Sequence, residues 1–181
     1  NKNRSHEVFK EYYFELLKSL GQHPEFKQIK FKIKSKIFLL DSTTISLCLS
    51  LFDWAKYKTA KGAVKMHTLL DYDGNLPAYI NITNGKTADN KGAYEIPLLK
   101  GSVIVADRFY NDFSLLNVWD SNDVFFVIRH KENLQFTTIK ENELPENRHA
   151  HILKDEIIEL KNDTSRAKYA KKLRRVSVYD E

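Results

Sequence analysis

The chain has 181 residues, of which 42% are hydrophobic and 29% are charged. This composition is typical of a folded globular domain and argues against a disordered chain. No apolar run approaches the roughly 18 residues that a membrane-spanning helix needs, so no membrane partner is expected. Cys48 is the one cysteine, which excludes an internal disulfide, and the first residues do not resemble a signal peptide. The expected compartment is therefore the cytoplasm.

The net charge of +5 is concentrated in one stretch late in the chain. Residues 161–175 contain one acid, Asp163, and the basic residues Lys161, Arg166, Lys168, Lys171, Lys172, Arg174 and Arg175. A local basic patch of this kind suits contact with a phosphate backbone such as that of DNA. It equally suits a solvated loop or hairpin without a ligand, and the sequence leaves both interpretations open.

The N-terminal part is predicted to be helical. Apolar residues recur at a spacing of four, as at Val8 and Tyr12, which is typical of an amphipathic helix. Ser5 can cap the start of this helix and Gly21 can end it. We expect residues 1–25 to lead into the main domain from an N-terminal region.

A strand is expected next. Lysines alternate with other residues from Lys30 to Lys36, which predicts a strand with one solvated face. The strand continues through the apolar run 37–40 and is predicted to end at Asp41. Residues 42–44 are then predicted to form a turn-like exit, because Ser and Thr favour turns.

The rest of the chain is predicted from alternation, helical spacing and turn residues. The expected elements are strands at 63–71 and 76–83, a helix at about 90–99, a strand at 102–106, a helix at about 112–119 and a strand at 124–128. The fold class is therefore α/β, with the order β-β-β-α-β-α-β in a core that covers residues 26–130. A β-rich appendage is expected at 131–181.

Two of these strands are apolar on both faces, and each is followed directly by an aspartate, Asp41 or Asp107. A meander of three strands, a helix and a fourth strand can place the fourth strand beside the first and parallel to it. Ligands bind at the carboxyl ends of strands at such switch points. Two neighbouring carboxylates repel each other unless a cation lies between them, and Mg²⁺ prefers oxygen ligands. The alternative is that each aspartate caps the turn after its strand.

Several segments resemble motifs of one protein family in their order and spacing. These segments are Asp41–Thr44, Lys61–His67, Asp73–Pro77, Thr83–Asp89, Asp107–Tyr110 and Phe126–Arg129. The first is similar to the first-aspartate motif, and the second and third together are similar to the hairpin after it. The last three are similar, in order, to the segment before the next helix, the second-aspartate motif and the strand that leads into a β-rich insertion. The family is that of the DDE insertion-sequence transposases, and the resemblance covers about residues 36–131.

The resemblance implies a fold and a reaction. The family has an RNase H-like core in which two aspartates and a distal glutamate bind two Mg²⁺ ions, with Mn²⁺ as a possible substitute. Water attacks at the transposon end, and the freed 3′-OH then attacks target DNA. By position, Asp41 is the first metal ligand and Asp107 the second. The implied partners are double-stranded DNA and a second copy in a homodimer, at the bacterial nucleoid.

The chain departs from the family pattern at two points. Phe109 stands where the second motif usually has glycine, which changes the backbone freedom beside the metal. The family's glutamate lies on a helix after the insertion, and no such helix follows Tyr179. Every glutamate after Asp107 lies in the appendage or just before it, so none is assigned this role. The chain is therefore expected to be an internal fragment that is inactive alone.

Basic residues near the two aspartates are candidate DNA contacts. They are Lys61, Lys65, Arg108 and Arg129, together with Lys171, Lys172, Arg174 and Arg175 of the basic stretch. For Arg108 the alternative is a surface ion pair, and for the lysines it is a solvated loop. Tyr110, Trp54 and Trp119 are expected to be packing residues.

Two other functions compete with transposition. One is a DNA-binding remnant that lacks a complete catalytic centre. The other is a phosphatase with an aspartyl nucleophile, because a strand that ends in Asp with Thr nearby also fits that class. Such phosphatases require a second aspartate two residues later, and Thr43 occupies that place.

Overall fold

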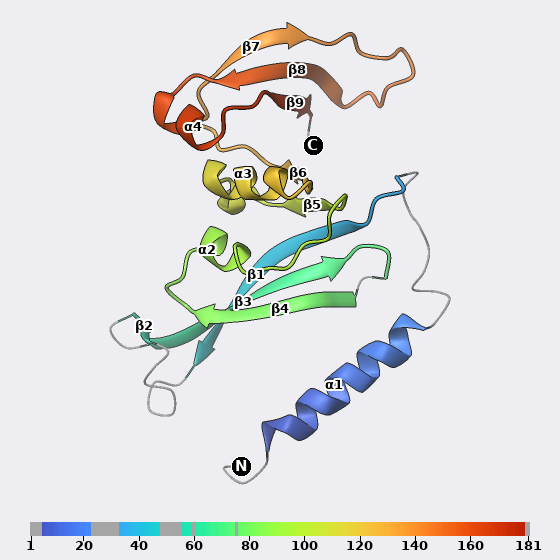
Figure 1. Cartoon of the computed structure of the whole chain (residues 1–181), viewed down its shortest axis with the longest axis vertical. Helices are drawn as coiled ribbons and strands as arrows, with labels where there is room; N and C mark the ends of the chain where they lie inside the picture. Colours follow the sequence, from blue (N-terminus) through green and yellow to red (C-terminus); the bar gives the residue numbers. More distant parts are fainter. Residues whose placement is uncertain (1–4, 23–32, 48–55, 59–60, 75, 180–181) are drawn as a thin grey trace.

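A computed structural model describes residues 5–22, 33–47, 56–58, 61–74 and 76–179 (Figure 1). Trp54 and Cys48 lie outside these residues. In chain order the elements are α1 (His6–Gly21), β1 (Ile37–Leu47), β2 (Lys56–Lys58), β3 (Lys61–Asp71), β4 (Leu76–Asn84), α2 (Asp89–Ala93), β5 (Val103–Ala106), η3 (Arg108–Tyr110), α3 (Phe113–Ser121), β6 (Phe125–Ile128), β7 (Phe136–Glu141), β8 (Ile152–Leu160), α4 (Asp163–Lys168) and β9 (Leu173–Val178). The predicted α/β class is confirmed by these elements.

The larger sheet is mixed, with the strand order β2-β3-β1-β5-β6 and with β4 also paired to β3. β1, β3 and β4 form an antiparallel meander, whereas β5 runs parallel to β1 and β6 runs parallel to β5. Parallel neighbours need a crossover connection, and α2 and α3 lie in the two crossovers. The predicted parallel pairing of the fourth core strand with the first is confirmed.

One face of this sheet is covered by α2 and α3. Strand side chains alternate between faces, and those of Phe38, Leu40, Leu69 and Ile104 point to the covered face and are at most 4% exposed. They form one hydrophobic cluster with residues of both helices, including the fully buried Leu115. The predicted packing roles of Tyr110 and Trp119 are confirmed, because both belong to this cluster and are at most 3% exposed.

The opposite face of the sheet is apolar but open. Phe125 and Val127 on β6 are 63% and 59% exposed, and Ile82 on β4 is 62% exposed. Asp41 belongs to this face, because it alternates with the buried Leu40. Figure 1 shows α1 standing apart from the layered body, and none of its residues is buried. Within the described residues, no helix is long and apolar enough to cross a membrane.

A second, three-stranded antiparallel sheet contains β7, β8 and β9. It reaches the main core through aromatic packing: the ring of Phe126 lies 6.4 Å from that of Trp119 and 6.2 Å from that of Tyr169, between ring centroids. Leu160 at the end of β8 is 2% exposed and joins the same cluster. Figure 1 shows this sheet on the far side of α3 from β1, β3 and β4.

Three details of the predicted elements are wrong. β1 does not end at Asp41, and residues 42–44 do not form the predicted turn, because the ladder of β1 with β3 extends to the pair Leu47–Gly62. Of the strand predicted from Lys30, residues 30–32 lie outside the described residues and residues 33–36 are not in a strand, since the pairing of β1 begins only at Ile37 with β5 and at Phe38 with β3. The helix expected at 90–99 covers only Asp89–Ala93, because residues that precede a proline disfavour helical geometry, and Pro97 follows.

Gly92 in α2 packs directly on the buried ring of His67. A Cβ atom added at Gly92 would lie 2.4 Å from Nε2 of His67, whose side chain is fully buried. Overpacking of this kind costs about 1–3 kcal/mol. We therefore expect Gly92→Ala to lower the free energy of unfolding by about that amount, measured by urea denaturation. Gly21→Ala is the matched control, because nothing lies within 4 Å of its added Cβ; an equal loss in both variants would contradict the packing argument.

Candidate active site

The two aspartates predicted as metal ligands occupy adjacent strands. In the parallel pairing of β1 with β5, Leu40 lies opposite Ala106. Asp41 directly follows Leu40, and Asp107 directly follows Ala106. Neighbouring strands are separated by about 4.8 Å. Both side chains are exposed. The structure therefore brings the pair together at the carboxyl end of β5, as the strand order predicts.

Their local settings differ. Asp41 lies within a strand, opposite Thr68 of β3, so it does not cap a turn. Its carboxylate makes no hydrogen bond or ion pair with any residue that the structure describes. Asp107 does cap a turn: it precedes the 3₁₀ turn η3, and its Oδ1 accepts a hydrogen bond from the backbone N–H of Phe109 at 2.8 Å. The capping alternative is thus confirmed for Asp107 alone and is compatible with a ligand role for its second oxygen.

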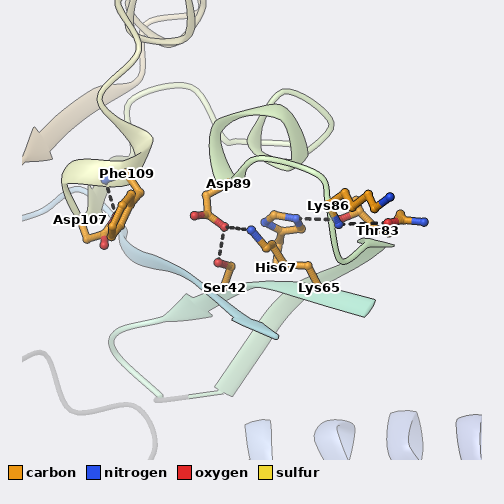
Figure 2. Close-up of polar contacts among 9 residues, drawn as sticks. Ser42, Lys65, His67, Thr83, Lys86, Asp89, Asp107 and Phe109 are labelled. Carbon is orange, nitrogen blue, oxygen red and sulfur yellow. Dashed lines mark hydrogen bonds and ion pairs between the residues drawn. The ribbon is translucent and has the colours of Figure 1, made fainter. Parts of the chain in front are cut away.

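A third acid, Asp89, lies near this pair at the first position of α2. Its Oδ1 accepts a hydrogen bond from Oγ of Ser42 at 2.5 Å and lies 2.9 Å from Nζ of Lys65. Figure 2 shows the side chains of Ser42 and Lys65 rising from two strands toward the Asp89 carboxylate. Burial alone would raise the pKa of Asp89, but the hydrogen bonds from Ser42 and Lys65 outweigh it, and the pKa is lowered. Asp89 is therefore an anion at neutral pH.

His67 extends this polar cluster across the sheet. Its ring is fully buried, and Nε2 lies 3.0 Å from Oγ1 of Thr83 on β4 (Figure 2). Burial lowers the pKa of His67 below its usual value; the nearby Asp89 carboxylate opposes this shift and Lys65 adds to it. The ring is therefore neutral at neutral pH and serves as a packed polar residue rather than as a cation.

Tyr110 lies beneath the acids. The side chain is 1% exposed and comes from the end of η3, the turn that Asp107 caps. Burial is the main reason that the pKa of its hydroxyl is raised, and the negative charges of Asp89, Asp41 and Asp107 raise it further. This direction agrees with the placement of Asp41 and Asp107 after the paired residues Leu40 and Ala106.

Two of the four basic residues predicted near the site, Lys65 and Arg108, are paired within the chain. Lys65 pairs with Asp89, and its side chain is only 14% exposed. Arg108 forms an ion pair with Glu132 at 3.1 Å, which is the surface pairing that the sequence left as an alternative. Arg129 is exposed just after β6. The side chain of Lys61 lies outside the described part of the structure.

The basic stretch on the second sheet is also largely neutralised. Arg174 donates two hydrogen bonds to Asp155, at 2.9 and 2.6 Å. Arg175 pairs with Glu156, and its guanidinium lies 4.9 Å from the ring centre of Phe136. Lys171 pairs with Asp120 of α3, and Lys172 is exposed. Much of the positive charge in this stretch therefore supports the packing of the sheet, whatever else it contacts.

The donor set suits a hard divalent cation. Asp41 offers two carboxylate oxygens, and Asp107 offers the oxygen that Phe109 does not use. Mg²⁺ is commonly held by one or two carboxylates, with water and substrate phosphates completing its coordination. Among the residues that the structure describes, no group of three or more His, Cys, Asp or Glu is placed to bind a metal. A divalent cation held by these two carboxylates would need further ligands.

Comparison with known proteins identifies the family. The family model described as the transposase DDE domain matches residues 32–178, which include both aspartates and the whole of the described β1–β9 region. The chain belongs to this transposase family. The recognition from sequence motifs is therefore confirmed. No solved structure shows a significant match.

Two curated relatives of the transposase family carry transposase names. A putative transposase, y4zB, of Sinorhizobium fredii is 25% identical over 118 residues, which is 65% of this chain and 33% of the relative. A probable transposase for insertion sequence element IS5377 of Geobacillus stearothermophilus is 29% identical over 97 residues, which is 54% of this chain and 26% of the relative. The chain thus spans about a third or less of the length of these transposases.

Sequence reasoning missed the polar cluster around Asp89. The sequence places both Lys65 and His67 in a strand. It indicates Lys65 as a candidate DNA contact and His67 only as part of a motif. Their spacing of two was the available signal, because it puts both side chains on one face of β3. Since Leu69 continues the same face into the core, Lys65 and His67 had to be at least partly buried and to need polar partners.

Proposed function

We propose that this chain provides the first two metal ligands of a DDE transposase, which cleaves and joins DNA phosphodiesters at the ends of an insertion sequence. The observation that supports it best is the position of Asp41 and Asp107, one residue beyond the parallel pair Leu40–Ala106. Family membership supports the reaction class, and the free carboxylate oxygens support the metal. The ion in question is Mg²⁺, with Mn²⁺ as a substitute.

The strand order also favours an RNase H-like core. A three-strand meander is followed by two parallel strands added on the side of β1, which gives β4-β3-β1-β5-β6. The expected β-rich insertion corresponds in this proposal to β7, β8 and β9, which follow β6 directly. Residues 26–130 and 131–181 would then be the core and the start of the insertion, with residues 1–25 leading into the core.

The third acid of the centre is proposed to come from a longer polypeptide. Curated relatives are roughly three to four times as long as the matched region, which covers 33% and 26% of them. Asp89 is not proposed as this ligand, because its Oδ1 is already occupied by Ser42 and Lys65. The open apolar face that carries Asp41 has room for a further element that bears an acid.

The proposed mechanism gives each described residue a limited task. Asp41 and Asp107 would hold metal ions by their free oxygens, and the hydrogen bond from the Phe109 N–H orients the carboxylate of Asp107. When bound, the metal ions stabilise the attacking and leaving oxygens of an in-line displacement at phosphorus. Arg129 is exposed at the same end of the sheet and is placed to contact a DNA phosphate. A homodimer would bring two DNA ends together.

Mg²⁺-dependent cleavage of DNA that carries the insertion-sequence end tests this proposal. The transposase polypeptide that contains this chain should nick at the end of the element with Mg²⁺ and should not cleave with EDTA or Ca²⁺. DNA binding without cleavage under all metal conditions would instead favour the DNA-binding remnant. Efficient Mg²⁺-dependent cleavage by residues 1–181 alone would contradict the proposed need for a third acid from elsewhere.

A further inference from the structure

Asp89 ties together the segments that carry the two proposed metal ligands. Through Ser42 it contacts the residue next to Asp41 on β1, and through Lys65 it contacts the neighbouring strand β3. α2, which begins at Asp89, also contacts η3, the turn that begins directly after Asp107. The Asp89 carboxylate therefore holds β1 and β3 to the start of α2, and α2 in turn contacts the turn that follows Asp107.

These contacts are largely shielded from solvent. The side chains of Asp89 and Lys65 are only 19% and 14% exposed. A sheltered ion pair contributes little net stability, because desolvation offsets the attraction of its charges. A hydrogen bond between a hydroxyl and a carboxylate is, however, short and directional, so it fixes geometry well. The arrangement is thus better suited to holding a position than to stabilising the fold.

We propose that Asp89 is a positioning residue for the metal site, which fixes the main chain at Ser42 and thereby the placement of Asp41 relative to Asp107. This inference rests on the proposed function. Asp89 does not contact the metal in this scheme. It acts through Ser42, whose backbone immediately follows that of Asp41, and Lys65 holds the Asp89 carboxylate in the orientation that accepts the Ser42 hydroxyl.

Ser42→Ala tests the inference with the smallest change. The variant removes the hydroxyl that Asp89 accepts and alters no charge and no proposed ligand. Hydrogen-bonding partners around metal ligands typically control about 10–100-fold of metal affinity. We expect Ser42→Ala to weaken Mn²⁺ binding by roughly tenfold, measured by electron paramagnetic resonance of free Mn²⁺ on the whole chain. Ser46→Ala is the control, because Ser46 lies exposed on the same strand and face.

The variant Lys65→Met distinguishes a positioning role of Asp89 from a purely electrostatic role of its charge. If Asp89 acted only as a negative charge near the metal, removal of its cationic partner would strengthen Mn²⁺ binding. If Asp89 acts by position, loss of Lys65 frees the carboxylate to rotate, and Mn²⁺ binding should weaken. Unfolding by urea on the same samples shows whether each variant is folded at the temperature of the metal titration.

The possible outcomes are distinct. Weaker binding in Ser42→Ala and Lys65→Met, with Ser46→Ala unchanged, supports a positioning role. Unchanged binding in Ser42→Ala, or tighter binding in Lys65→Met, overturns it. Wild-type binding that is insensitive to Asp41→Asn and Asp107→Asn would instead overturn the metal site of the proposed function, and this inference with it.

Discussion

Asp41→Asn and Asp107→Asn are each expected to lower the rate of Mg²⁺-dependent DNA cleavage by the transposase at least about a thousandfold. An amide is a poor ligand for Mg²⁺, which prefers charged oxygen donors. The metal contributes several kcal/mol of transition-state stabilisation in such reactions, and a loss of about 4 kcal/mol is roughly a thousandfold in rate. Neither side chain is buried, so both variants should fold normally.

The measurement is single-turnover cleavage of end-containing DNA, with DNA affinity determined in parallel by gel shift. Asp163→Asn is the matched control, because the Asp163 side chain is 90% exposed at the start of α4, remote in sequence from both aspartates. DNA affinity should stay within about twofold of wild type in every variant, since the substitutions remove negative charge and no cation. A variant at Asp41 or Asp107 that still cleaves at the wild-type rate would show that the ligand assignment is incorrect.

Leu115→Ala is expected to be the most destabilising single core substitution considered for this chain. The side chain is 0% exposed and lies on α3, within the cluster that joins this helix to β1, β3 and β5. Truncation of a buried leucine costs about 2–5 kcal/mol, because transfer energy is lost and a cavity remains. Such a loss is a large part of the stability of a typical domain, which is about 5–15 kcal/mol.

Chemical denaturation of the chain checks this expectation. Leu99→Ala is the control: Leu99 is 59% exposed, and surface substitutions usually change stability by less than about 0.5 kcal/mol. A similar shift in the two variants would mean that the packing of α3 onto the sheet contributes little. Loss of the cooperative transition in Leu115→Ala would agree with the prediction in its strongest form.

The architecture was largely predictable because hydrophobic patterning determines which elements form. Apolar runs at 37–40 and 102–106 indicated the central strands, and the connection between them allowed the parallel pair that the structure has. The ends of individual strands and helices were harder to predict. The continuation of β1 to Leu47 depends on backbone pairing with β3, and a ladder of this kind leaves no mark in a stretch of Ser and Thr residues.

The adjacency of Asp41 and Asp107 was predictable from the sequence, whereas the contacts around them were not. Asp41 and Asp107 each follow an apolar run, so the sequence marks them directly. Asp89 meets Ser42 and Lys65 only after α2 has docked on the sheet, and this contact depends on long-range packing. The positive charge of the basic stretch was evident from the sequence. The pairing of its arginines with Asp155 and Glu156 was not, because it depends on the register of β8 with β9.

The parallel pairing of β1 with β5 has a consequence for synthesis of the protein. Asp41 leaves the ribosome well before Asp107, and the pair is created only when β5 joins the edge of the meander. Closing so long a loop is among the slower steps of folding. A nascent or truncated chain that stops before β5 therefore contains Asp41 without Asp107. The proposed DNA-cleaving centre therefore cannot form until β5 has paired with β1 in the central sheet.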